Sequence, residues 1–271
     1  MKAVSCFVKK LNIRSFNPQF SAIIAKFIPE IPDLFPYLAI LSLTYQSLTV
    51  LSSNFCKLTE LQSLHLKGDD ISEIPSYLFH QMLDLVHLRL ELPSMQQLPS
   101  FKSSMGKLKH LILRNLPLVS EISSFFEFTP KLEELLFLIV AIQTLPLSFF
   151  ELNTLNTLKI LCCSHFSHFP EINLADAPLR ENLIFLYLNW VEVVECPILQ
   201  HLPDYLFYSP NLEVFNCLRC STLQILPHQY SIASHLIGFT VHQCGTVNAN
   251  HYNPPKKHLI FLKINLFLNY L

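Results

Sequence analysis

The chain has 271 residues, of which 51% are hydrophobic and 14% are charged, and its formal net charge is −1. Such a chain can bury a large core and does not have the composition of a disordered segment. Its near-neutral charge, with Lys and Arg scattered, excludes a global electrostatic preference for nucleic acid. It contains only four glycines, and no G-x-G-x-x-G or G-x-x-x-x-G-K loop, which excludes the common phosphate-binding motifs.

The apolar segments of the sequence are too short to cross a membrane. The longest uncharged apolar run, Leu135 to Ile142, falls far short of the ~20 residues that a spanning helix needs. The first residues do not contain an apolar stretch long enough for a secretory signal, and no N-x-[ST] sequon occurs. We therefore expect an intracellular, cytoplasmic protein without a membrane span.

A leucine pattern, LxxLxL, recurs along nearly the whole chain at intervals of 23 to 29 residues. Each copy predicts a short strand with its leucines on one face, because alternate side chains of a strand point to opposite sides. In chain order the copies begin at Leu38, Leu61, Leu85, Leu108, Leu132, Leu155, Leu183, Leu212 and Leu236. A partial copy begins at Leu259, and Val8, Leu11 and Ile13 form a candidate earlier one.

A second pattern follows most of the predicted strands: two apolar residues three positions apart, with proline after the second. Proline fixes φ and removes a backbone donor, so it suits an irregular return segment better than a regular helix. The pairs that precede a proline are Ile71/Ile74, Met95/Leu98, Ile142/Leu145, Phe166/Phe169, Leu199/Leu202 and Leu223/Leu226.

Together the two patterns resemble the leucine-rich-repeat family, in its form with 23–24-residue repeats, and are similar to Ras-group repeat proteins and the recognition domains of plant immune receptors. The resemblance implies an α/β-type solenoid, a curved arc with a concave parallel β-sheet and an irregular or short-helical convex side. It divides the chain into a degenerate N-terminal repeat or cap (1–37), a solenoid of about nine repeats (38–245), and a loop with a partial C-terminal repeat (246–271).

The turn after each predicted strand departs from the family pattern. The family places Asn three residues after the last strand leucine, and we name this place the turn position. No Asn occupies it here; its occupants are Gln46, Asp69, Pro93, Leu116, Val140, Cys163, Val191, Cys220 and Cys244. Because Pro, Leu and Val cannot replace the amide hydrogen bonds, we expect irregular turns and lower stability from Pro93 to Val140.

Two predicted repeats, those beginning at Leu155 and Leu183, are about five residues longer than the others. The extra residues fall in 171–178 and 191–197, and such insertions form either tolerated bulges or binding loops. The apolar C-terminal residues do not resemble a polar cap. We therefore expect either that the chain is part of a longer protein or that a partner covers this end.

Eight cysteines raise the question of a metal, disulfide or catalytic site. Cys217, Cys220, Cys244 and His251 have loosely zinc-like spacing, but the repeat places Cys217 inward on a strand and the next two at turn positions. In the segment 162–168 the repeat likewise accounts for a turn cysteine, and no base or oxyanion site is apparent. We expect free thiols, no metal or cofactor, and no enzymatic activity.

The outward-facing strand residues are better candidates for function, because they form the concave face of the predicted sheet. Toward the amino end they are basic and rich in histidine: His65, Lys67, His87, Arg89, His110 and Arg114. In the centre they are apolar or aromatic: Ile112, Leu136, Leu138, Leu161, Phe185 and Tyr187, flanked by Trp190. Lys159, also outward on its strand, is a further candidate for partner binding. Exposed apolar patches of this size are unusual on monomers, and aromatic residues and arginine are favoured interface anchors.

These two zones predict a protein-recognition module that binds a protein partner on its concave face, with no nucleic-acid partner. The resemblance suggests the recognition part of an immune-receptor-like protein, with a role in the immune response, or a microbial effector. The alternative is the substrate-recognition part of an enzyme complex such as a ubiquitin ligase. The apolar zone disfavours a purely structural spacer, whereas flanking segments that cover this zone would weaken the binding hypothesis.

Overall fold

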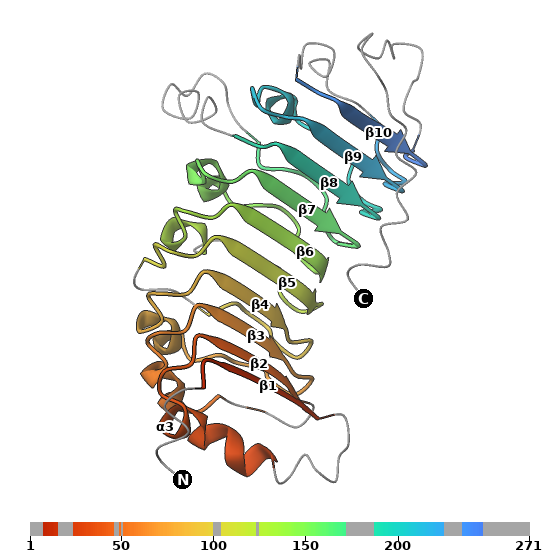
Figure 1. Ribbon diagram of the computed structural model, residues 1–271. Helices are drawn as coiled ribbons and strands as arrows, with labels where there is room; N and C mark the ends of the chain where they lie inside the picture. Colours follow the sequence, from red (N-terminus) through yellow and green to blue (C-terminus); the bar gives the residue numbers. More distant parts are fainter. Residues whose placement is uncertain are drawn as a thin grey trace.

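The computed structural model describes residues 8–15, 24–45, 49, 51–99, 104–122, 125–171, 187–224 and 235–245. These residues form one ten-stranded sheet in which every pair of neighbouring strands is parallel and the strands follow one another in chain order. Figure 1 shows the strands stacked as the successive rungs of an arc. They are β1 (Lys10–Ser15), β2 (Ile40–Tyr45), β3 (Ser63–Lys67), β4 (His87–Glu91), β5 (His110–Leu116), β6 (Glu134–Val140), β7 (Thr157–Leu161), β8 (Trp190–Val194), β9 (Val214–Leu218) and β10 (Gly238–His242).

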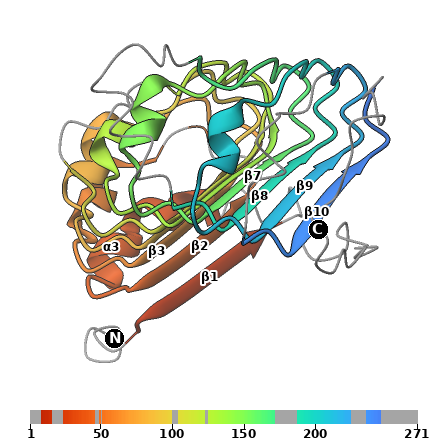
Figure 2. The ribbon, with the colours of Figure 1, turned by 90° about the horizontal axis from the view of Figure 1, so that it is seen from above.

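The return segments carry short helices on the side away from the sheet (Figure 2). They are η1 (Ile28–Glu30), α3 (Ile31–Leu34), η2 (Ser53–Lys57), η3 (Ser76–His80), η4 (Phe126–Phe128), η5 (Leu147–Glu151) and η6 (Asp204–Phe207). Pro75, Pro146 and Pro203 immediately precede η3, η5 and η6, where a fixed φ and a missing N–H are harmless. The curved solenoid with a parallel sheet and a short-helical convex side is confirmed.

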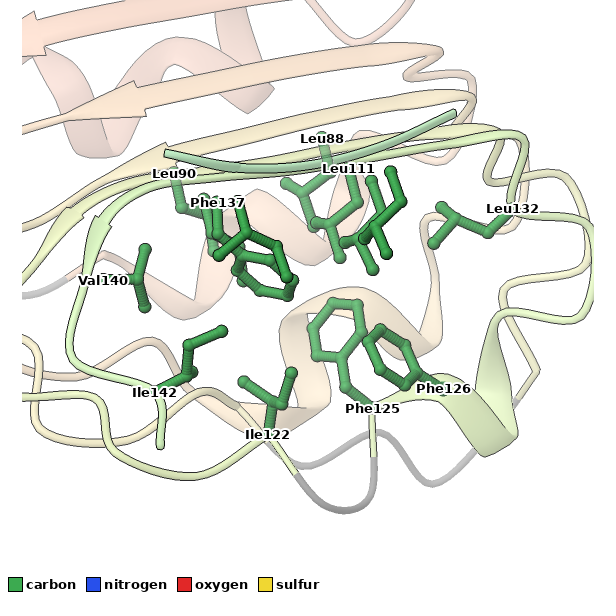
Figure 3. Close-up of a cluster of buried hydrophobic side chains, with 14 of the residues drawn as sticks. Leu88, Leu90, Leu111, Ile122, Phe125, Phe126, Leu132, Phe137, Val140 and Ile142 are labelled. Atoms are coloured by element: carbon green, nitrogen blue, oxygen red, sulfur yellow. The ribbon is translucent and has the colours of Figure 1, made fainter. Parts of the chain in front are cut away.

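The core is a stack of inward side chains from successive strands. Leu88 pairs in register with Leu111, and Leu111 pairs with Leu135, and all three are at most 1% exposed. Figure 3 shows the sheet leucines pointing toward Phe125 and Phe126 of the return segment. Each coil thus buries its apolar residues against its neighbours and could not do so alone.

The sheet begins earlier than the securely predicted repeats. Leu11 and Ile13 of β1 pair with Leu41 and Leu43 of β2, so the candidate early copy is a strand of the same sheet. The copy predicted at Leu259 lies outside the described residues.

The eighth strand lies later in the chain than the leucine pattern predicts. Its inward residues are Val191 and Val193, and Leu188 supplies the buried residue ahead of them. The prediction of a strand copy starting at Leu183 is therefore wrong. It failed because Leu183, Leu186 and Leu188 also satisfy LxxLxL, and the motif alone preferred leucine to valine.

The corrected register changes the position of the insertions. The intervals become 188 − 155 = 33 and 212 − 188 = 24 residues, so the extra length falls in one repeat rather than two. Residues 191–197, expected as an insertion, instead contain most of β8 and the turn that follows it.

The expected irregular turns between Pro93 and Val140 are wrong for Leu116 and Val140. These two residues extend β5 and β6 to seven residues each and pair with one another across the strands. Ala141 N–H also donates to the Leu116 carbonyl at 3.2 Å. Both side chains are buried, and the pairing of Leu116 with Val140 continues the strand ladder through the turn position.

Candidate functional site

The corrected register places a fourth cysteine, Cys196, at the turn position instead of Val191. Cysteine therefore fills this position in the last four coils that the structure describes, as Cys163, Cys196, Cys220 and Cys244. Each thiol lies within donating distance of a backbone carbonyl, such as Leu161 O for Cys163 at 3.4 Å and Ile160 O for Cys196 at 3.7 Å. A thiol at this position donates to a backbone carbonyl, as one N–H of the family's Asn amide would. This is a structural role, as predicted for the turn cysteines.

The residue just before the turn position has positive φ in six successive coils. These residues are Asn115, Ile139, Cys162, Glu195, Arg219 and Gln243, with φ between 49° and 59°. None is glycine, so each conformation costs free energy that its surroundings must offset. In the later coils the side chains interact with one another: Arg219 Nη1 donates to Glu195 Oε1 at 2.6 Å, and Arg219 Nε to Gln243 Oε1 at 3.2 Å.

The paired cysteines of the segment 162–168 have raised pKa values. Burial and a 3.3 Å hydrogen bond to Glu195 raise the pKa of Cys162 to about 11, and burial raises the pKa of Cys163 to about 12. Nucleophilic thiols need the opposite shift. Neither thiol is therefore activated for catalysis.

The basic zone of the concave face is organised around one buried carboxylate. Glu91, 5% exposed, pairs with Lys67, with Arg89 at 3.6 Å and with Arg114 at 3.8 Å. We call these four residues the Glu91 cluster. The cations were predicted from the sequence as site residues and Glu91 was not, although its position between basic residues of neighbouring strands indicates a role. Three cations against one carboxylate leave the cluster with a net charge of +2.

The three histidines of this zone also lie on the outward face of their strands. His65 Nδ1 lies 3.2 Å from Ser42 Oγ. Burial of the imidazole ring, together with the positive charge of Arg89, lowers the pKa of His65 to about 4. The rings of His87 and His110 stack at 4.4 Å, and His110 Nδ1 lies 3.2 Å from Glu134 Oε2. Burial and His110 lower the pKa of His87. Near neutral pH the charge of the zone therefore comes mainly from the Glu91 cluster.

The central apolar zone differs from the prediction in two residues, Leu136 and Tyr187. Leu136 takes an outward strand position between Ile112 and Lys159 but is only 1% exposed, because side chains crowd together in the middle of a concave face. Tyr187 is 41% exposed but precedes β8 rather than lying on a strand. Phe185 lies outside the described residues.

Leucine and valine side chains nevertheless form an apolar row on the last outward position of four consecutive strands. Leu138 pairs with Leu161, Leu161 with Val194, and Val194 with Leu218. We call these four residues the apolar band. Leu138, Leu161 and Leu218 are partly exposed and Val194 is 9% exposed. Leu138 and Leu161 were predicted from the sequence, whereas Val194 and Leu218 were not. Val194 was not predicted because the leucine pattern gives the wrong register at β8.

Polar residues occupy the row beside the apolar band. Lys159 pairs in register with Glu192, and Glu192 with Asn216. Lys159 Nζ lies 5.5 Å from the centroid of the Trp190 ring. Glu192 is 2% exposed, and burial raises its pKa against the opposing effect of Lys159. The correct strand register alone brings Glu192 to this face.

Comparisons with known proteins identify the fold through structure rather than sequence. No family model matches the chain, and no curated protein matches it. The leucine-rich-repeat domain of the type III effector XopL is 19% identical and superposes with a TM-score of 0.60 over 79% of this chain and 71% of that domain.

Two further solved structures are similar over much of the chain. A leucine-rich-repeat protein of Leptospira interrogans is 15% identical, with a TM-score of 0.37 over 89% of this chain and 85% of that one. The functional domain of InlJ from Listeria monocytogenes, which includes a cysteine ladder, is 14% identical, with a TM-score of 0.43 over 78% of this chain and 45% of that one.

No helix in the described part of the chain has the length and apolar character needed to span a membrane. The repeated leucine pattern, the arc of ten parallel strands and the likeness to the XopL domain agree with one another. The chain has the fold of the leucine-rich-repeat family.

Proposed function

We propose that the chain is a protein-binding module that uses the concave face of its sheet. The observation that carries the proposal is the adjacency of two zones on that face. The Glu91 cluster lies on β3 to β5 and the apolar band on β6 to β9, so the two zones follow one another along the arc. A partner that spans neighbouring coils would meet cationic side chains first and an apolar surface next.

The two zones would contribute differently to binding. Apolar side chains at the centre of an interface give most of the binding energy when water is excluded. The net charge of the Glu91 cluster would chiefly raise the association rate of an acidic partner, and salt would weaken this effect. The partner predicted by this chemistry is a protein segment with acidic residues beside leucine-like side chains.

Variants on the two faces of the arc test the proposal. Leu161→Asp places a charge in the apolar band, and Arg89→Gln removes one cation from the Glu91 cluster. Glu73→Lys changes charge on an exposed return segment and serves as the control. Leu136 is not suitable for this test, because a buried aspartate there would disturb the fold.

The experiment compares the proteins that each immobilised variant captures from a lysate, quantified by mass spectrometry. The expected result is a partner that the parent and Glu73→Lys both retain, that Leu161→Asp loses, and that Arg89→Gln holds less well at low salt. A partner lost with Glu73→Lys and kept with Leu161→Asp would place binding on the convex side and reject the proposal.

A further inference from the structure

Three cysteine thiols converge at the carboxyl-terminal end of the described sheet. The Sγ atoms of Cys217, Cys220 and Cys244 all lie within 4.8 Å of one another, and those of Cys217 and Cys244 are 3.7 Å apart. We call these residues the thiol cluster. The sequence pattern gives the three cysteines separate structural roles, one inward on a strand and two at turn positions. Folding brings all three together.

One separation among these sulfur atoms matches that of two ligands around one metal ion. With a zinc–sulfur distance of about 2.3 Å, two sulfur ligands of a tetrahedral ion are about 3.8 Å apart. The Cys217–Cys244 separation of 3.7 Å already has this value. Small rotations of the Cys220 side chain would bring the third sulfur into the same sphere. Thiolates are soft ligands and select soft cations such as copper(I) and zinc.

The backbone around the thiol cluster holds the turn of the last coil close to the coil before it. Gly245 N–H donates to the Cys220 carbonyl at 3.2 Å. A Cβ atom at Gly245 would lie 2.3 Å from the carbonyl oxygen of Leu223, so only glycine allows this approach. Cys217 and Cys220 are buried, and Cys244 is partly exposed. The cluster is therefore built on fixed backbone and remains open to solvent on the Cys244 side.

We propose that the thiol cluster binds one thiophilic cation, zinc or copper(I), through the three sulfur atoms of Cys217, Cys220 and Cys244. On binding, each S–H bond is replaced by a sulfur–metal bond and its proton goes to solvent. Binding also breaks the hydrogen bonds that the Cys220 thiol donates to Val193 O and the Cys244 thiol to Cys217 O, and the loss of these bonds reduces the affinity. No electron transfer is involved.

Proton release makes the binding dependent on pH. A thiol binds a cation as the thiolate, so each ligating thiol that carries a proton loses it when the cation binds. A cation must displace the proton, and its apparent affinity rises as the pH is raised.

The test titrates the reduced, metal-free full chain with Zn²⁺, and in a separate arm with Cu⁺, each against a chromophoric chelator. The expected result is one ion bound per chain in at least one arm. Cys244→Ala should lower the affinity at least about 100-fold, since even outer-shell changes cost about 10- to 100-fold. Cys163→Ala is the matched control, because it removes a turn cysteine outside the thiol cluster and should keep full affinity.

A second measurement on the parent protein covers the case in which Cys244→Ala does not fold. Cys244 and Cys56 are both partly exposed, and only the former belongs to the cluster. The bound cation should protect Cys244 from alkylation by iodoacetamide and leave Cys56 reactive. Absence of stoichiometric binding in both arms, equal loss of affinity in Cys163→Ala, or unchanged alkylation of Cys244 would each overturn the proposal.

Discussion

The two halves of the arc close the same turn by different chemistry. In the middle coils, Leu116 and Val140 are buried and lengthen the strand ladder. In the four described coils nearest the carboxyl end, cysteine thiols donate to carbonyls, and charged or polar side chains pair beside them. The fold thus does not depend on one residue type at the turn position. It depends on pairing each buried backbone group, whether by the ladder or by a side chain.

The concave face also differs between the halves. The amino-terminal half places three cations around Glu91, whereas the carboxyl-terminal half carries the apolar band beside buried Glu192 and Asn216. The inward side chains of both halves are nearly all aliphatic or aromatic. Core and concave face therefore vary independently along the solenoid, and stability and binding can be tested with separate variants.

The largest effect is expected in the core that both halves share. Leu111→Ala and Leu135→Ala each remove a fully buried side chain from the middle of the stack and should cost ~2–5 kcal/mol of unfolding free energy. Urea unfolding followed by circular dichroism measures the loss. Losses below ~1 kcal/mol for both variants would show that these leucines are not inward residues.

A smaller effect is expected at the Glu91 cluster. Glu91→Gln leaves Lys67, Arg89 and Arg114 without their common carboxylate, and hydrogen bonds to charged groups contribute ~1.5–3 kcal/mol. The same urea measurement applies. The control is Glu60→Gln, which breaks an exposed pair with Lys9 and should cost at most ~1 kcal/mol. Equal losses of unfolding free energy for the two variants would mean that the ion pairs of Glu91 stabilise the fold no more than an exposed pair does.

Acid should weaken the amino-terminal half through His65. Its folded-state pKa, about 4, lies below the ordinary 6.5, so the unfolded chain binds the proton first and stability falls between pH 6.5 and pH 4. Allowing for solvent screening, the loss attributable to His65 is ~1–2 kcal/mol. His65→Gln should flatten the stability profile over this range, while the exposed His165→Gln should follow the parent. A variant at residue 65 that also follows the parent would refute the assignment.

The smallest effect separates the two kinds of turn. Cys163→Val keeps an apolar side chain but removes the donor to the Leu161 carbonyl, at a cost of ~1 kcal/mol. Val140→Cys, in a turn closed by the strand ladder, should change stability less. Thermal unfolding of the two variants side by side gives the comparison. A greater loss for the second variant would indicate that the two turns do not differ as described.

The leucine pattern predicts the fold and most of the strands because inward residues must recur once per coil. It does not place β8, since two overlapping matches lie five residues apart and leucine is favoured over Val191 and Val193. Cys196 indicates the correct position of β8 in the sequence. Only the later register aligns it with the other turn cysteines and restores a 24-residue interval to Leu212.

The candidate site was harder to predict than the fold, because exposure depends on neighbours in space. The outward position of Leu136 follows from strand alternation, but its burial depends on crowding by adjacent coils. The meeting of Cys217 with Cys244 likewise depends on how the last turn folds back on the previous coil. One-dimensional periodicity contains neither kind of information.

Binding through the concave face is the central claim, and site-specific photo-crosslinking tests it most directly. A benzophenone amino acid replaces Leu218 in the apolar band or, in a matched sample, Glu73 on the exposed return segment. Each protein is irradiated with the partner captured by the parent chain. Binding through the concave face predicts a covalent adduct from residue 218 and none from residue 73, whereas an adduct from residue 73 alone would contradict it.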